Sequence, residues 1–411
     1  MTPWRVSVEG GAAWHFAHAA WKVGPGLSPG DPQLKKMHDL LVRDLELSGF
    51  FHWIPEGSYA EDAQAAPVVD GEIDFAPWRT LGADFLIKAT AEQSGGAYAL
   101  ELRLHKVPDA RQILGRKYQV PPSQLAAAVH DFANRVLEAT TGKMGAFGTR
   151  IVFSSTRGHA GRKDIFVIDT DGSNLTRLTF DDKIAMMPDW SPSGSSILYT
   201  SYRSYKPDLW IQDAATGRPS LIASGGLNTG GAFSPDGRRV AFSKDGNICI
   251  IGVDGSGFTK LTSGDALDVS PSWSPDGSQI VFVSDRAGRP QLYLMNSDGS
   301  GQRKISTMGM DHGSPRFSPD GQMIAFEANP GPWRIYVMNA DGSGVRRVSD
   351  GPGSDEHPSW SPDGRTLVYS SGGGGSSSLF LVSALGGKPV RLTDGRAMDL
   401  QPDWGPMQHA P

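Results

Sequence analysis

Short apolar runs of strand length, each followed by a polar turn, fill the chain from about residue 150 onward. In the stretch that begins at residue 270, a short strand is expected at 270–273, apolar runs cover 279–284 and 292–295, and a more polar outer strand is expected at 303–306. Apolar side chains at successive positions indicate strands buried on both faces. Pro and Gly between the runs favour tight turns, since Pro fixes φ and Gly accepts a positive φ. The pattern predicts a four-stranded antiparallel sheet.

The same order of strands and turns recurs, and six near-copies of one phrase mark it. They are Trp190-Ser-Pro-Ser-Gly, Phe233-Ser-Pro-Asp-Gly, Trp273-Ser-Pro-Asp-Gly, Phe317-Ser-Pro-Asp-Gly, Trp360-Ser-Pro-Asp-Gly and Trp404-Gly-Pro. Successive aromatic residues are 43, 40, 44, 43 and 44 positions apart. A period near 40 residues in a strand-rich sequence is typical of propellers with four-stranded blades. We therefore expect an all-β six-bladed β-propeller over residues 146–411.

The two ends of the repeat array complement each other. Residues 149–154 read as a second strand with no first strand before it, whereas residues 401–404 read as a first strand with no second strand after it. Closing a ring removes the exposed sheet edges that an open array would leave. We expect the C-terminal strand 401–404 to complete the first blade.

Residues 1–145 have a different pattern and predict a smaller N-terminal α/β domain. Asp31 and Pro32 indicate the start of a helix, with an apolar stripe that begins at Leu34 and with Gly49 after its end. Ser123 is expected to cap a second helix. Strands are expected at 5–8, 16–23, 50–54, 83–90, 98–104 and 112–118, the last three as an antiparallel meander.

The propeller loops fall into two sets. The repeated Ser-Pro-Asp-Gly and Asp-Gly-Ser-Gly turns share one face, and the varied loops and blade-to-blade crossings share the other. Varied charged loops on a rigid scaffold are where binding usually occurs. The candidate partner-binding residues are Arg157, Arg203, Arg286, Asp311, His312, Asp355, Glu356, His357 and Asp399. Of these, His312, Asp355, Glu356, His357 and Asp399 are expected near the mouth of the central channel, because the crossings lead into the innermost strands.

Several positions suggest other chemistry. His312 and His357 occupy equivalent positions in adjacent blades beside carboxylates, so a shared metal is an alternative to partner contact or loop hydrogen bonding. The segment 169–173 is too short for a calcium loop and lacks its distal Glu. The glycines at 372–375 precede neither the Lys nor the helix of a phosphate-binding loop. No hydrolase elbow or zinc-protease pair is present, so we expect neither an enzyme nor a cofactor.

Composition narrows the class of partner. The 411-residue chain has a formal net charge of −5, which gives no general attraction to nucleic acid. Its one cysteine, Cys249, lies in an apolar run and rules out a disulfide framework. No apolar run approaches the 18 residues of a membrane span. The first residues do not read as an export signal. We therefore expect either that the protein is cytosolic or that a secretion signal has been removed from this sequence. We expect a monomer.

Four segments besides the repeats carry a family resemblance. They are Asp44-Leu-Glu-Leu-Ser-Gly-Phe, Gly82-Ala-Asp, Gly115-Arg-Lys-Tyr, and the joint at residues 141–153. With the Trp-Ser-Pro-Asp-Gly repeats, they make nearly the whole chain similar to the TolB family of the Tol–Pal envelope system.

This resemblance implies a periplasmic, non-enzymatic scaffold that supports outer-membrane integrity and cell division. It implies that the peptidoglycan-associated lipoprotein docks at the propeller mouth and that residues 1–12 contact TolA. Two departures are the missing export signal and the Ala- and His-rich stretch 12–21. The alternative function is an accessory or substrate-binding propeller of a peptidase or glycan-processing system.

Overall fold

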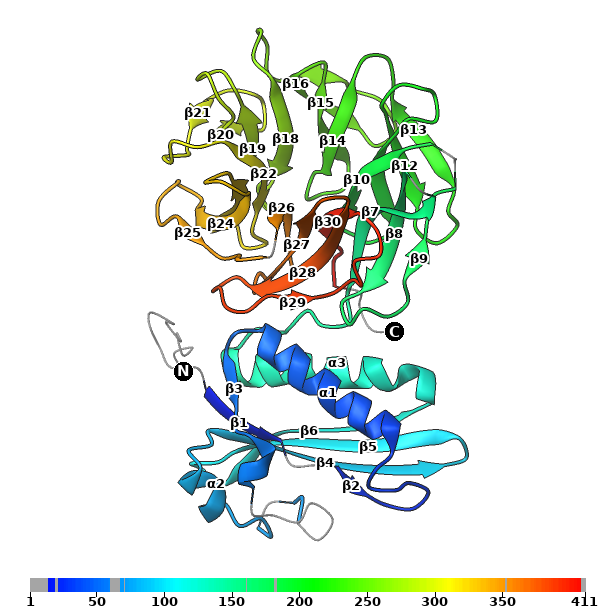
Figure 1. Cartoon of the computed structure of the whole chain (residues 1–411), viewed down its shortest axis with the longest axis vertical. Helices are drawn as coiled ribbons and strands as arrows, with labels where there is room; N and C mark the ends of the chain where they lie inside the picture. Colours follow the sequence, from blue (N-terminus) through cyan, green and yellow to red (C-terminus); the bar gives the residue numbers. More distant parts are fainter. Residues whose placement is uncertain are drawn as a thin grey trace. The chain divides into compact units, whose positions relative to one another are not determined.

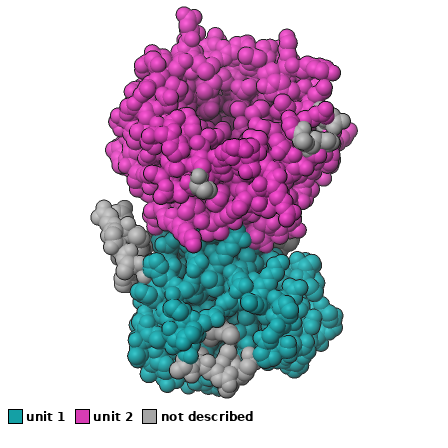
Figure 2. Space-filling model, viewed as in Figure 1, with its two compact units in different colours: residues 1–148 teal, residues 149–411 magenta. Residues whose placement is uncertain are grey.

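The chain folds into two compact units, residues 1–148 and 149–411 (Figures 1 and 2). The structure, a computed structural model, describes residues 14–18, 21–59, 67–69, 71–159, 161–180, 183–351 and 353–407. The strand expected at 5–8 and the proposed TolA segment 1–12 lie outside the described residues.

The first unit is an α/β domain with one mixed sheet, ordered β3-β1-β4-β5-β6, in which β2 also pairs with β4. Its strands are β1 Trp14–His18, β2 Lys22–Val23, β3 Phe51–Trp53, β4 Phe85–Ser94, β5 Ala97–Lys106 and β6 Arg111–Val120. Its helices are α1 Pro32–Leu47, α2 Ala76–Thr80 and α3 Leu125–Thr141, with short 3₁₀ turns at Glu56–Ser58 and Pro122–Gln124. The apolar sides of α1 and α3 form one core with the sheet (Figure 1).

Local sequence explains how the two long helices begin. The carboxylate of Asp31 accepts the backbone N–H groups of Gln33 and Leu34, which caps α1 as expected. Ser123 does not cap α3. A 3₁₀ turn leads into this helix, its N-cap is Gln124, and no side chain caps it. The preceding Pro121-Pro122 pair favours that entry because both prolines fix φ near the helical value.

The second unit is a six-bladed β-propeller of four-stranded sheets, as predicted. Blade 1 contains β30 Asp399–Trp404, β7 Arg150–His159, β8 Arg162–Asp169 and β9 Thr176–Arg177. Blade 2 contains β10 Ala185–Trp190, β11 Ser196–Ser201, β12 Asp208–Asp213 and β13 Pro219–Ala223. Blade 3 contains β14 Asn228–Phe233, β15 Arg239–Lys244, β16 Asn247–Gly252 and β17 Thr259–Lys260.

The remaining three blades repeat this order. Blade 4 contains β18 Asp268–Trp273, β19 Gln279–Ser284, β20 Gln291–Asn296 and β21 Arg303–Lys304. Blade 5 contains β22 His312–Phe317, β23 Met323–Ala328, β24 Arg334–Asn339 and β25 Arg346–Arg347. Blade 6 contains β26 Ser354–Trp360, β27 Thr366–Gly373, β28 Ser376–Ser383 and β29 Val390–Arg391. The first strands of the six blades contact one another around a closed cycle.

The repeated Ser-Pro-Asp-Gly phrase makes the same turn in blades 3 to 6. In blade 4, the Ser274 hydroxyl donates to Asp276 at 2.5 Å and accepts the Gln279 N–H at 2.9 Å. Gly277 then adopts a φ of 71°, a conformation that costs little without a Cβ. Ser234, Ser318 and Ser361 make the same pair of bonds. Ser191 of the Ser-Pro-Ser-Gly variant in blade 2 also accepts the Ser196 N–H, at 2.9 Å, so the serine of the phrase stabilises this turn in five blades.

The C-terminal strand belongs to blade 1. β30 pairs with β7 in an antiparallel register that joins Asp399 to Ser155 and Trp404 to Ile151. The indole N–H of Trp404 also donates to the Thr149 hydroxyl at 2.7 Å. The two ends of the propeller sequence are therefore held together by a full strand pairing.

Candidate functional site

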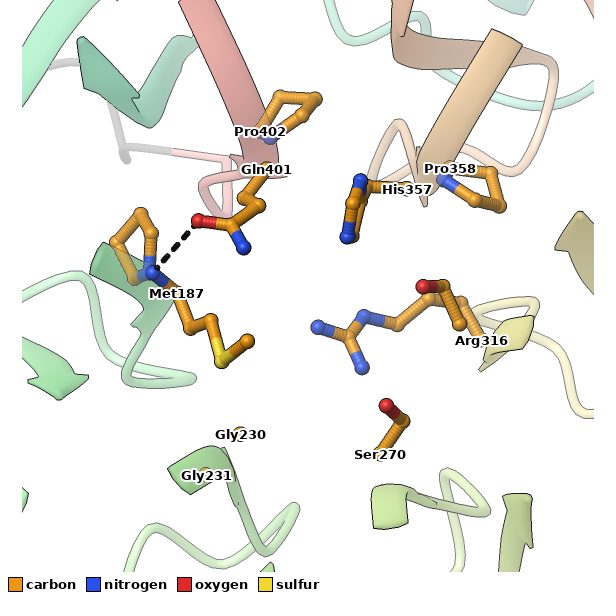
Figure 3. A pocket seen from close by; sticks show the side chains of 11 residues that line it. Met187, Gly230, Gly231, Ser270, Arg316, His357, Pro358, Gln401 and Pro402 are labelled. Atoms are coloured by element: carbon orange, nitrogen blue, oxygen red, sulfur yellow. Dashed lines mark hydrogen bonds between the residues drawn. The ribbon is translucent and has the colours of Figure 1, made fainter. Parts of the chain in front are cut away.

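A ring of six backbone positions with positive φ, five of them not glycine, lines the central channel. Each first strand has a bulge in its pairing with the second strand, and one residue per bulge has a positive φ. These residues are Met187, Gly230, Ser270, Ser314, His357 and Gln401, with φ between 45° and 63°. Non-glycine residues seldom adopt this conformation. All six line one pocket (Figure 3), so the bulges direct six side-chain positions into the channel.

This channel pocket, defined by those six residues together with Arg316, encloses about 60 Å³. Figure 3 shows the Arg316 guanidinium extending to the middle of the pocket, between His357 and Ser270. The Gln401 carbonyl oxygen accepts the Ser154 hydroxyl at 3.0 Å and the Met187 N–H at 3.2 Å. Its amide nitrogen therefore faces the pocket. Arg316 and Gln401 therefore present N–H donors to a pocket whose other walls include three prolines and two glycines.

Two positions further along each first strand, a second ring joins neighbouring blades. We call it the girdle; its six positions are residues 189, 232, 272, 316, 359 and 403. At four of them a side-chain oxygen accepts a backbone N–H of the next blade: Asp403 from Trp190, Asp189 from Phe233, Ser272 from Phe317 and Ser359 from Trp404, at 2.8 to 3.3 Å.

Ala232 and Arg316 interrupt the girdle because neither side chain can accept a hydrogen bond. There the next blade's tryptophan compensates. The Trp273 indole donates to the Ala232 carbonyl at 3.3 Å, and the Trp360 indole donates to the Arg316 carbonyl at 3.0 Å. All six junctions between blades are therefore bridged, four by side-chain acceptors and two by indoles.

The opposite end of the channel opens at the face that carries the repeated turns. A second pocket of about 250 Å³ there is lined by the six repeat aromatics and by prolines of the Ser-Pro turns. Five of these aromatics, Trp190, Phe233, Trp273, Trp360 and Trp404, are at most 9% exposed. They pack between blades and leave little ring surface for a ligand.

Buried carboxylates surround Arg316 at a distance. Burial and the neighbouring Asp403 raise the pKa of Asp189 to about 8, and burial raises the pKa of Asp403 as well. Burial raises the pKa of Glu327 to about 7, although Glu327 accepts the His357 N–H and the Ser314 hydroxyl. The Arg316 charge opposes each of these shifts. The channel therefore contains acids that hold protons near neutral pH.

Replacing Asp189 by Asn is expected to stabilise the protein above neutral pH. The raised pKa means that the folded state binds more protons than the unfolded state between about pH 4 and 8, so stability falls as pH rises through this window. The asparagine side chain stays neutral and still accepts the Phe233 N–H. The variant should gain about 1–3 kcal/mol at pH 8 and little below pH 4. Urea unfolding across this range measures the gain, with exposed Asp350→Asn as control. An unchanged pH slope would contradict the assignment.

Four of the sequence-predicted carboxylate and arginine candidates take part in three buried ion pairs. Asp399 is fully buried and binds Arg157 through both oxygens, at 3.0 and 2.6 Å. Arg286 binds buried Asp268 at 3.0 Å. Asp355 is also fully buried, and its partner is Arg334 from the preceding blade at 3.5 Å. Asp355 and Asp399 therefore lie inside the loop layer and not at its surface. There each carboxylate holds an arginine side chain in place.

His312 is likewise buried, at 2% exposure, and its ring lies against Phe326 within blade 5. Its Nδ1 lies 3.3 Å from the Gln291 amide, and burial lowers its pKa to about 4. A neutral imidazole packed in this way is not accessible to a partner. Among the described residues, no three metal-ligating side chains gather. Of the two histidines, His357 lines the channel pocket and His312 does not.

The other candidates are accessible. His357 lies in the channel pocket, where burial lowers its pKa to about 4. Glu356 and Asp311 have side chains that are 33% and 40% exposed. The Arg203 guanidinium lies over the Trp210 ring, 4.1 Å from its centroid.

Sequence reasoning missed the pocket residues Arg316, Ser270, Met187 and Gln401. It treated the first strands as scaffold and looked for function in the loops. A signal was present: five of the six bulge residues directly precede a proline, three positions before the repeat aromatic. The residue before proline is restricted in conformation, so a recurrent X-Pro step inside a strand could have marked the bulges.

Exposed apolar side chains gather at the loop end of blades 2 to 4. Ile184, Leu227 and Leu267 each immediately precede the first strand of a blade and are 36%, 61% and 53% exposed. Tyr205, 80% exposed, lies in the second-to-third loop of blade 2, with the Lys183 ammonium 4.3 Å from its ring centroid. We call Ile184, Tyr205, Leu227 and Leu267 the apolar arc. Exposed apolar residues in equivalent positions of successive blades are typical of an interaction surface.

The fold and channel define a closed six-bladed propeller with an N-terminal α/β domain. Residues 137–408 match the TolB beta propeller domain, and residues 18–113 match the TolB amino-terminal domain. The chain belongs to the TolB family, as its sequence predicted.

Relatives agree with this assignment, and a solved structure shares the fold. The chain is 37% identical over 242 residues to the Tol-Pal system protein TolB of Anaeromyxobacter dehalogenans, covering 57% of this chain and 54% of the relative. It is 33% identical over 260 residues to a TolB homolog of Chlorobium chlorochromatii, covering 62% and 58%. These matches span little more than half the length of the curated relatives. The crystal structure of TolB from Acinetobacter baumannii shares the fold, with a TM-score of 0.82, 24% identity and coverage of 96% and 97%. No helix in the described residues is long and apolar enough to cross a membrane.

Proposed function

We propose that this chain is the periplasmic propeller component of a Tol–Pal system and that it acts as a scaffold without a catalytic step. Its role is to bind the peptidoglycan-associated lipoprotein at the loop face and thereby to support outer-membrane integrity during cell division. The names of its curated relatives support this role. The observation that carries the docking site is the apolar arc, which lies exposed at the loop end of blades 2 to 4.

The arc provides the apolar centre of the proposed interface, and polar and charged side chains provide its rim. Glu356, His357, Asp311 and Arg203 are the accessible members of the predicted set. Asp355 and Asp399 contribute by fixing Arg334 and Arg157 through the ion pairs described above. Interfaces commonly combine a buried apolar centre with a polar rim.

The proposal is tested by calorimetric titration of the full chain with the folded periplasmic domain of the lipoprotein. Leu227→Ala combined with Leu267→Ala should weaken binding about tenfold or more, since each truncation removes roughly 1 kcal/mol of apolar burial. Leu385→Ala is a matched control, because Leu385 is 52% exposed in a turn on the opposite face. Absence of measurable binding by the unaltered chain, or an equal loss in the Leu385 variant, would overturn the proposal.

The second proposed partner is TolA, contacted by residues 1–12, which lie outside the described residues. A chain that starts after residue 12 should lose TolA binding in the same titration and keep its affinity for the lipoprotein. Loss of both affinities together would contradict a separate TolA segment.

A further inference from the structure

We propose that the channel pocket binds a carboxylate, which the Arg316 guanidinium holds. This inference goes beyond the proposed function, because it concerns the interior of the propeller and does not depend on which protein docks outside. It rests on the chemistry of the pocket, on the state of the nearby acids, and on the size of the cavity.

Arg316 provides an uncommitted cation. Its guanidinium makes no hydrogen bond and no ion pair with any part of the chain that the structure describes. Its backbone is fixed, because the Arg316 carbonyl accepts the Trp360 indole and the adjacent Phe317 N–H donates to Ser272. A guanidinium presents donors in a planar fork that matches the two oxygens of a carboxylate. The side chain is therefore placed to bind such a group and has no internal partner to give up.

The other side chains around Arg316 add donors. The Gln401 amide nitrogen faces the pocket because its oxygen is already occupied by Ser154 and Met187. The Ser270 hydroxyl and the His357 ring also line the cavity (Figure 3). The lowered pKa of His357 keeps its imidazole neutral. The ring therefore supplies one N–H donor to the pocket without adding a second positive charge.

The nearby acids do not neutralise Arg316 by direct contact. Asp189 and Asp403 accept backbone N–H groups of the next blade, and Glu327 accepts the His357 N–H, so each has partners of its own. Burial raises the pKa of Asp189 to about 8 and that of Glu327 to about 7, so these two acids carry less than full negative charge near neutral pH. An external anion therefore meets little competition from internal carboxylates for the Arg316 guanidinium.

The cavity suits a small group. A volume of about 60 Å³ holds a few water molecules, since each needs roughly 10–15 Å³ by this measure. A carboxylate on a short stem fits this space, whereas a sugar or nucleotide does not. The ligand is either a free small carboxylate or an acidic side chain that enters from the loop face.

Acetate is the probe that tests the site, with chloride at equal ionic strength as the reference. At about ten times its dissociation constant, acetate should raise the unfolding midpoint of the full chain by about 3 °C at neutral pH. The shift should vanish in Arg316→Gln and persist in Arg289→Gln, an exposed arginine of the loop face. Saturable broadening of the acetate methyl NMR signal checks binding independently of stability. No saturable response in the unaltered chain, or the same response in Arg316→Gln, would overturn the proposal.

A second arm identifies the source of the carboxylate. Lipoprotein binding is titrated in acetate and in chloride for the unaltered chain and for Arg316→Lys, which keeps the charge but loses the planar fork. If acetate weakens lipoprotein binding to the unaltered chain, and weakens it several-fold less in the lysine variant, the carboxylate belongs to the docked protein. Saturable acetate binding without competition assigns it to a free carboxylate.

Discussion

Removing residues 401–411 is expected to lower the free energy of unfolding by about 5 kcal/mol or more. The deletion takes away most of β30, exposes the edge of β7 and removes the Trp404 side chain, which is 9% exposed. Loss of a buried tryptophan alone costs roughly 3–5 kcal/mol. The deletion also removes Asp403, the acceptor for the Trp190 N–H. Urea unfolding, followed by tryptophan fluorescence, measures the loss.

The control for this deletion is a chain that ends at Met407. It keeps all of β30, the bond between Trp404 and Thr149 and the girdle bond to Trp190. Its unfolding midpoint should equal that of the full chain. If the chain ending at Leu400 unfolded at the same urea concentration as this control, the pairing of β30 with β7 would not be what closes the ring.

Replacing Asp399 by Ala is expected to cost about 2–4 kcal/mol. Asp399 accepts two bonds from Arg157 and one from the Ser155 hydroxyl, all inside the loop layer of blade 1. Breaking a buried pair from one side leaves the other charge without compensation, a change that typically costs 3–5 kcal/mol. Arg157 keeps its bond to Asp394, which lowers the expected cost. The free energy of urea unfolding at neutral pH gives the value.

Asp394→Ala is the matched control, because Asp394 binds the same arginine from the surface. Its side chain is 45% exposed, against 0% for Asp399. Exposed ion pairs contribute about 0–1 kcal/mol. Equal losses from the two substitutions would show that Asp399 does not act as the buried anchor of Arg157.

The fold was predictable because its signal repeats. Ser-Pro-Asp-Gly turns are local chemistry, and the spacing of Trp190, Phe233 and the later aromatics counts the blades directly. The cap of α3 was predicted wrongly, since Ser123 competes with a Pro-Pro step that imposes a 3₁₀ turn. Capping depends on details of the backbone that a single serine does not determine.

The channel chemistry was less predictable than the blades. His312 and Asp355 were expected near the channel mouth as partner-binding residues, but their side chains are buried by neighbouring elements. Such burial depends on partners that are distant in sequence, such as Arg334 for Asp355. Arg316 was overlooked because it lies within a strand, where the bulge two residues earlier turns the register toward the channel.

The interruptions in the girdle leave two positions of the channel wall open to variation. At residues 189, 272, 359 and 403, the side chain must accept the neighbouring blade's N–H, which restricts these positions to short oxygen-bearing residues. At residues 232 and 316, a tryptophan indole bonds to the main-chain carbonyl instead. Any side chain that fits can stand there without loosening the ring. Substitutions at residues 232 and 316 could therefore change which ligands the channel binds during evolution, while the hydrogen bonds between blades stay in place.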